Sequence, residues 1–99
     1  MSSVDLSDVP QRGLQLRLYV AGSAPNSLRA IANLKAICAE HFPDSHELEI
    51  VDLLWHPQRA LADGVIVTPT LLKLFPLPVQ RVIGNLSDTS QVMLALNGH

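Results

Sequence analysis

A proline inside a run of strand-forming residues constrains this chain more than any other feature. Thr68-Pro69-Thr70 is followed at once by Leu71-Leu72-Lys73-Leu74-Phe75. Because proline cannot donate a hydrogen bond to a sheet ladder, Pro69 must stand at the beginning or the edge of a strand. An X-Pro bond is also the one peptide bond for which the cis form costs little free energy. The sequence therefore predicts a strand that begins just after Pro69.

The hydrophobic pattern predicts seven elements after a flexible N-terminal lead over residues 1–13, which is rich in Ser and Asp. Alternation and branched aliphatic residues predict strands, and apolar residues at helical spacing predict helices. Asn26 or Ser27 can cap the first helix, and Ser87 or Asp88 the last. The predicted elements are a strand over 14–20, a helix from about 28 to 41, a strand over 48–54, a short helix over 56–63 stopped by Gly64, strands over 71–75 and 79–83, and a final helix through Leu96.

The order strand, helix, strand, helix, strand, strand, helix resembles the thioredoxin-like α/β fold, with a proline ahead of the final hairpin. A right-handed crossover makes the first two strands parallel, and the last two strands form an antiparallel hairpin. Thiol–disulfide exchange on this fold needs a low-pKa cysteine where the first helix begins. The corresponding turn reads Gly22-Ser23-Ala24-Pro25, and the single cysteine, Cys38, lies on the apolar face of the helix. We therefore expect Cys38 in the core and no redox catalysis by the familiar route.

Composition narrows the function classes further. Ninety-nine residues make one domain, expected over residues 14–99, and only 16% of the residues are charged. A formal net charge of -2 with scattered Lys and Arg gives no electrostatic case for nucleic-acid binding. The polar, acidic N-terminus is unlike a secretory signal, so a cytoplasmic protein is expected.

No catalytic or metal-binding constellation emerges from the remaining polar residues. The histidines, His41, His46, His56 and His99, form no ligand pair at helical spacing, and no zinc signature is present. Glu49 and Asp52 are three apart on a strand, so they face opposite sides of the sheet. We expect no cofactor. The residues alone point to a binding module.

Several segments, aligned without a gap from about Leu14 to Leu96, resemble the KaiB family of circadian clock proteins. They are Leu16 to Ser27, Val51-Asp52-Leu53-Leu54 with Pro57-Gln58, Thr68-Pro69-Thr70-Leu71 with Lys73, and Pro76, Pro78-Val79, Arg81, Ile83-Gly84 and Leu86-Ser87. The resemblance implies a non-enzymatic regulator that binds the ATPase and autokinase KaiC, sequesters KaiA and displaces the thioredoxin-like domain of the kinase SasA.

The same resemblance implies two folds for one chain. In the free tetramer the order is expected to be strand, helix, strand, strand, helix, helix, strand, and a free crystal is expected to favour this arrangement. The thioredoxin-like arrangement is expected for the monomer that binds the ATPase, with Pro69 cis there and trans in the other arrangement. Mixed strand and helix propensities over residues 65–75 and 79–83 are compatible with such a switch.

Eight residues are candidates for partner binding or for the fold switch. Compared with better-known clock members, Trp55 and Gly64 each replace a lysine, Leu14 replaces an aromatic residue and Asn85 replaces an aspartate. Trp55 is either an exposed interface anchor or a side chain folded back onto the core. The full set is Leu14, Trp55, Gly64, Pro69, Lys73, Arg81, Gly84 and Asn85.

Two functions remain open. The first is a clock-type regulator that binds a KaiC-like ATPase. The second is a KaiB-like paralogue with a holdase or stress-related function, acting through exposed apolar surface. The differences from the better-known clock members at Leu14, Trp55, Gly64 and Asn85 suggest a divergent paralogue.

Overall fold

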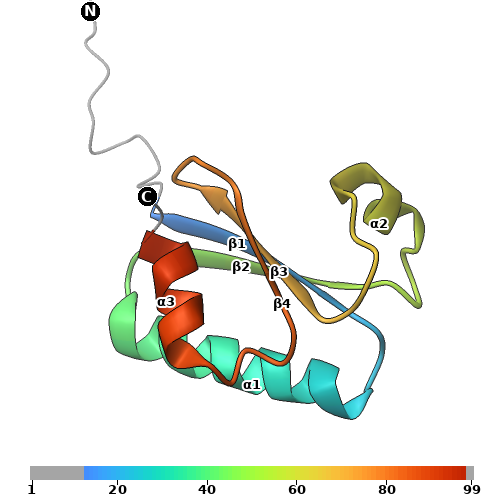
Figure 1. Cartoon of the computed structure of the whole chain (residues 1–99), viewed down its shortest axis with the longest axis horizontal. Helices are drawn as coiled ribbons and strands as arrows, with labels where there is room; N and C mark the ends of the chain where they lie inside the picture. The colour runs from blue at the N-terminus through green and yellow to red at the C-terminus, as the bar shows by residue number, and fades with distance from the viewer. Residues whose placement is uncertain (1–12, 98–99) are drawn as a thin grey trace, which may run out of the picture.

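The computed structural model describes residues 13–97, so nearly all of the predicted N-terminal lead lies outside the described residues. The seven elements follow the predicted order (Figure 1). They are β1 (Leu14–Val20), α1 (Pro25–His41), β2 (His46–Asp52), α2 (Gln58–Asp63), β3 (Thr70–Phe75), β4 (Gln80–Ile83) and α3 (Thr89–Asn97). This order confirms the thioredoxin-like α/β class.

The four strands form one sheet in the order β2-β1-β3-β4. β1 pairs with β2 in parallel, and β3 pairs antiparallel with both β1 and β4. The predicted crossover and hairpin are therefore both present. The Thr68–Pro69 peptide is cis, as expected for this arrangement, and so are the Phe75–Pro76 and Leu77–Pro78 peptides within the β3–β4 connection.

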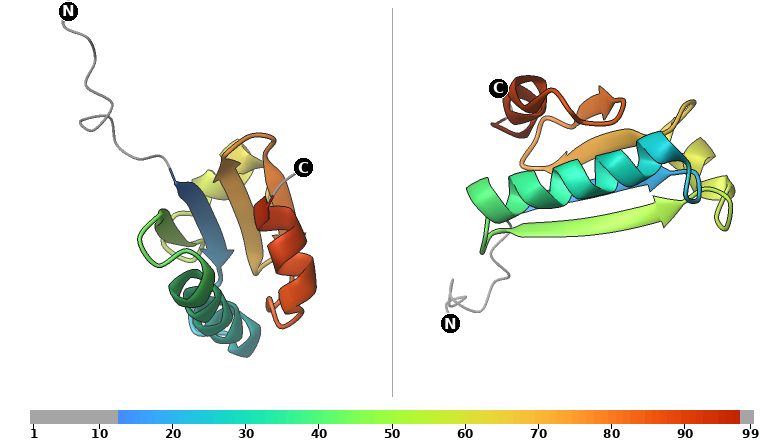
Figure 2. Two further views of the ribbon diagram at one scale, coloured as in Figure 1. Left: turned by 90° about the vertical axis from the view of Figure 1, so that its left-hand side faces the viewer. Right: turned by 90° about the horizontal axis from the view of Figure 1, so that it is seen from below.

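The helices cover the two faces of the sheet unequally. Figure 2 shows α1 and α3 together on one face, whereas α2 lies on the other. Alternation along β1 explains the main core, because Leu14, Leu16, Leu18 and Val20 all point toward α1 and α3. They pack there with aliphatic residues of both helices and with Cys38, whose predicted core position is confirmed. Burial raises the pKa of the Cys38 thiol, which suits a packing role.

A second, smaller apolar cluster lies on the α2 side of the sheet. It consists of Tyr19, Val51, Val65 and Leu72, and we call it the minor cluster. Tyr19 belongs to it because it alternates with the β1 residues that face α1.

The beginning of α1 differs from the prediction. The helix starts at Pro25, a residue tolerated in the first turn because it lacks only a hydrogen-bond donor that would be unpaired there. Neither Asn26 nor Ser27 is the N-cap residue, which is Ala24. Ser27 is buried inside the first turn, and its Oγ accepts a hydrogen bond from the Ala21 backbone N–H at 3.1 Å. At the start of α3 the prediction holds, since Asp88 Oδ1 accepts from the Gln91 N–H at 3.1 Å.

The structure presents the thioredoxin-like arrangement, and the second arrangement of residues 50–96 stays a prediction for the free oligomer.

Within the described residues, no helix is long and apolar enough to cross a membrane.

Candidate functional site

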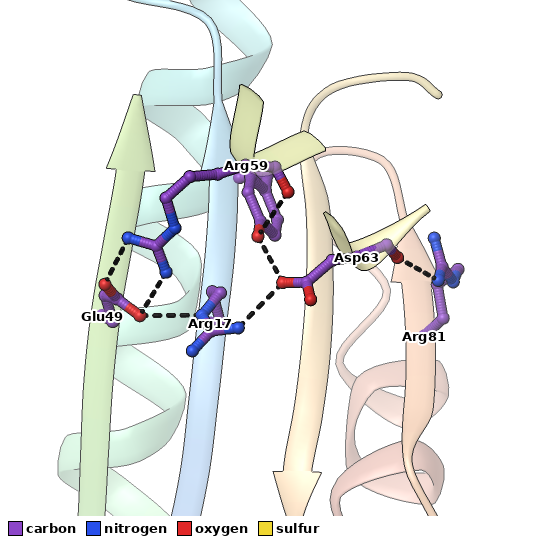
Figure 3. Close-up of polar contacts among 6 residues, drawn as sticks. Arg17, Glu49, Arg59, Asp63 and Arg81 are labelled. Atoms are coloured by element: carbon purple, nitrogen blue, oxygen red, sulfur yellow. Dashed lines mark hydrogen bonds and ion pairs between the residues drawn. The ribbon is translucent and has the colours of Figure 1, made fainter. Parts of the chain in front are cut away.

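Polar side chains from three strands meet α2 on the side of the sheet away from α1 (Figure 3). Arg17 on β1 and Glu49 on β2 are partners in the parallel register, so the pairing of these two strands places them side by side. Arg59 and Asp63 reach this face from α2, and Arg81 reaches it from β4. We call Arg17, Tyr19, Glu49, Arg59, Asp63 and Arg81 the polar network.

Glu49 holds two arginines at the β2 end of the polar network. Its carboxylate accepts from Arg17 Nε at 2.7 Å and from Arg59 Nη1 and Nη2 at 2.8 and 3.1 Å. The contact with Arg59 is bidentate, the geometry in which a guanidinium–carboxylate pair is strongest. These bonds hold the pKa of Glu49 at about 2, with the hydrogen bond from Arg59 as the largest cause and that from Arg17 next.

Asp63, the last residue of α2, makes the corresponding contacts with β1. Its Oδ2 accepts from Arg17 Nη1 at 2.8 Å and from the Tyr19 hydroxyl. The Tyr19 hydroxyl also lies 3.2 Å from the carbonyl oxygen of Arg59. The hydrogen bond from Tyr19 is the largest cause that lowers the pKa of Asp63, whereas burial is the main cause that raises the pKa of Tyr19.

The guanidinium of Arg81 binds backbone carbonyls at the end of α2. Its Nη2 donates to the Asp63 carbonyl oxygen at 2.9 Å, and its Nη1 donates to that of Gly64 at 3.0 Å. These carbonyls belong to the end of a helix, where the backbone lacks intrahelical partners. Gly64 ends α2 in the left-handed region, with φ of 66°, as the sequence predicted for a stop at this glycine.

Both carboxylates of the polar network are paired with arginines, which disfavours a role in proton transfer. Each carboxylate has at least one guanidinium partner, and the pKa values of Glu49 and Asp63 are both lowered, so neither is poised to take up a proton near neutral pH. No group of three potential metal ligands occurs among residues 13–97. The turn before α1, where a thioredoxin carries its thiols, has none.

Trp55 stands in the turn after β2 and its side chain is 79% exposed. Of the two interpretations of this residue, the exposed position is therefore correct and the core position is wrong for this arrangement. Other exposed large apolar side chains flank α2 in the chain or lie on it: Leu54, Leu61, Ile66 and Val67.

Three other predicted site residues come together at the end of the β3–β4 hairpin. The Gly84 N–H donates to the Pro69 carbonyl oxygen at 3.0 Å. Gly84 has φ of 117°, a backbone conformation that side chains rarely adopt. The next residue, Asn85, accepts a hydrogen bond from Asn33 Nδ2 on α1 at its carbonyl oxygen, at 2.9 Å. The structure thus links this turn to α1.

Leu14 and Lys73 are both buried in this arrangement. Leu14 lies in the main core. Lys73 is 1% exposed and pairs with Leu16 and Gln80 in the sheet, and its Nζ has no hydrogen-bond partner among the described residues. Their influence on partner binding or on the fold switch stays a prediction.

Sequence reasoning missed most of the polar network. Only Arg81 was a candidate, and Arg17, Tyr19, Glu49, Arg59 and Asp63 were not. The available signal was opposite charge at matching positions of two strands expected to be parallel, but it becomes informative only when the register between them is known.

Fold and site together define a thioredoxin-like domain without the cysteine pair, in which polar residues attach a helix to the sheet. The family model described as the KaiB domain matches residues 17–97. The chain belongs to the KaiB family. It is 46% identical over 88 residues to the circadian clock oscillator protein KaiB of Synechococcus elongatus, an alignment that covers 89% of this chain and 86% of that protein.

Further comparisons agree. The circadian clock protein KaiB3 of Synechocystis is 48% identical over 82 residues, which cover 83% of this chain and 80% of the relative. Among solved structures, the N-terminal domain of SasA from Synechococcus elongatus matches with a TM-score of 0.72 and 27% identity over 95% of this chain and 90% of that one. A thioredoxin of Drosophila melanogaster, Deadhead, matches with a TM-score of 0.70 at 14% identity over 96% and 97%, which shows the shared fold alone.

Proposed function

We propose that this chain is a circadian clock regulator that acts without catalysis in the cytoplasm, by binding a KaiC-type ATPase and autokinase. The observation that carries the proposal is the 46% identity to a KaiB clock oscillator protein over 89% of the chain. The compensated polar network and the buried thiol favour a binding function over a chemical one.

The fold supports a more specific proposal about competition. The described arrangement matches the N-terminal domain of SasA over 95% of the chain. Two domains of one fold can present the same backbone surface to a shared partner, so we propose that this chain and a SasA-like domain bind the ATPase in mutually exclusive fashion. A KaiA-like protein is proposed as a further partner, and the free chain as a homotetramer or dimer.

Size-exclusion chromatography with light scattering tests the proposal. The chain is mixed with a KaiC-type ATPase from the same organism, in the presence of ATP, and incubated for many hours so that a slow fold switch does not hide binding. We expect co-elution with the ATPase. If the two proteins elute separately after long incubation at excess of this chain, the proposal is wrong.

Exposed apolar side chains favour a second candidate function, a holdase. Leu61 and Ile66 are 86% and 93% exposed, and Trp55 precedes the same region in the chain. Such surface can bind partly unfolded clients. Light scattering of a heat-denatured client protein, with and without this chain, tests the function. Unchanged client aggregation at stoichiometric excess of the chain would eliminate it.

A further inference from the structure

The attachment of α2 to the molecule differs in kind from that of the other helices. None of its residues, Gln58–Asp63, is buried, whereas α1 buries five residues and α3 buries Val92 and Leu96. Among the residues of α2, Ala60 is the partly buried one that packs against the minor cluster. Hydrophobic burial scales with the apolar area removed from water, so it holds α2 only weakly.

Polar contacts supply what apolar packing does not. Arg59 binds Glu49 on β2, and Asp63 binds Arg17 and Tyr19 on β1. Arg81 on β4 binds the two carbonyls that end the helix. Figure 3 shows these contacts reaching α2 from opposite sides, with Glu49 and Arg17 on one side and Arg81 on the other.

Apolar residues of the sheet lie where α2 attaches. Tyr19, Val51 and Leu72 are buried in the minor cluster on this face, and Ala60 of α2 packs against them. Val65, two residues after the end of α2, completes the cluster and donates its N–H to the Ala60 carbonyl oxygen at 2.8 Å. Movement of α2 would therefore carry Val65 with it and expose apolar sheet surface.

We propose that α2 is a lid, held over the minor cluster by the polar network, and that it opens as a unit while β1 and α1 remain folded. Opening exchanges the hydrogen bonds between α2 and the sheet for bonds to water, and it breaks no part of the main core, which contains no residue of α2. The inference does not depend on the proposed binding function, because it concerns the isolated chain. Local opening of this kind is measurable as amide exchange that is faster than global unfolding allows.

Hydrogen–deuterium exchange at neutral pH tests the lid with two variants. Each removes, from a different strand, some of the polar contacts that attach α2 to the sheet, which we call the latch. Arg81→Ala removes both contacts with the end of α2 at an exposed position. Tyr19→Phe removes the hydroxyl contacts and keeps the buried ring. The control, Arg29→Ala, removes an exposed arginine on α1 whose hydrogen bond goes to Asn26.

The reporters are the Gly64 and Val65 amides, which donate to carbonyls of α2. We expect each latch variant to accelerate their exchange by about tenfold, the effect of losing hydrogen bonds to charged groups, and the control to leave it unchanged. Exchange in β1 and α1 should not change in any of the three. In the wild-type chain, raising the salt concentration from about 0.05 M to about 1 M should accelerate the same two amides, because the ion pairs are screened.

Two results would overturn the lid. Unchanged exchange at Gly64 and Val65 in Arg81→Ala would show that the latch does not hold α2. Equal acceleration across α1, β1 and α2 would show that α2 opens only with the whole molecule. Arg81→Ala decides the question by itself if Tyr19→Phe fails to fold, since Arg81 is not part of either apolar cluster.

Discussion

Lys73 occupies a position that is expected to lower the stability of the folded chain. Its side chain is buried and its Nζ lacks a hydrogen-bond partner among the described residues. An amine removed from water without a partner costs free energy that apolar neighbours cannot return. Lysine is almost never fully buried unless it is paired, so residue type alone does not predict this position. Strand alternation with Leu71, which faces the main core, does explain it.

Lys73→Met should stabilise the thioredoxin-like arrangement by about 1–3 kcal/mol, because it keeps the apolar stem and removes the unpartnered amine. Denaturant unfolding monitored by circular dichroism measures the change. Lys35→Met, at an exposed position of α1, is the matched control and should change the free energy of unfolding by less than about 0.5 kcal/mol. A Lys73→Met chain no more stable than the wild type would contradict this assignment of cost to the amine.

We propose Trp55, which is 79% exposed, as a contact with the partner. Trp55→Ala should weaken the affinity for the KaiC-type ATPase by about 30-fold, the effect of removing an interface anchor. Leu94→Ala is a control on α3, distant from α2 in Figure 1, with a side chain 78% exposed. Fluorescence anisotropy of the labelled chain measures both. Equal affinities for the two variants would show that Trp55 is not an anchor.

At the scale of elements, the helices and strands follow from local sequence, but their mutual contacts do not. Period-2 alternation predicted β1, and the Pro69 and Gly64 positions predicted where β3 begins and α2 ends. Arg17 and Glu49 meet because β1 and β2 pair in one particular register, which is a property of the whole sheet. Sequence reasoning therefore found the scaffold and missed the polar network that it builds.

The polar network makes stability depend on pH. The pKa of Glu49 is about 2 in the folded chain, below its ordinary 4.5, and that of Asp63 is also lowered. Above about pH 4.5 both carboxylates are ionised, and their contribution is fully present. As the pH falls toward 2, protons bind the unfolded chain first, so the free energy of unfolding decreases.

Glu49→Gln isolates this contribution. Because Glu49 is about half exposed, solvent screening limits the effect to about 1 kcal/mol. We expect the wild-type chain to lose that amount relative to Glu49→Gln between pH 5 and pH 2, measured by urea unfolding at several pH values. Parallel pH profiles for the two chains would contradict a stabilising role for the Glu49 contacts.

At the scale of the whole molecule, we expect residues 50–96 to adopt either of two arrangements. Here residues 50–96 form a short helix, two strands and a helix after the end of β2. Family membership leads us to expect a second arrangement, with two consecutive helices, in a free oligomer at high concentration. Association would stabilise that arrangement by mass action, so dilution should favour the one described above.

Backbone chemical shifts of residues 50–96, recorded over a range of protein concentrations, distinguish the two arrangements. We expect strand, helix, helix, strand at high concentration and an increase in the helix, strand, strand, helix pattern on dilution. A single pattern at every concentration, with a constant molecular mass, would show that this chain does not switch between the two.

We propose that this thioredoxin-like chain binds a KaiC-type ATPase at a site shared with a SasA-like domain. The most direct test is an anisotropy titration of the labelled chain with the ATPase, followed by addition of unlabelled SasA N-terminal domain. We predict saturable binding that the added domain reverses. No rise in anisotropy, or a rise that excess SasA domain leaves unchanged, would contradict the claim.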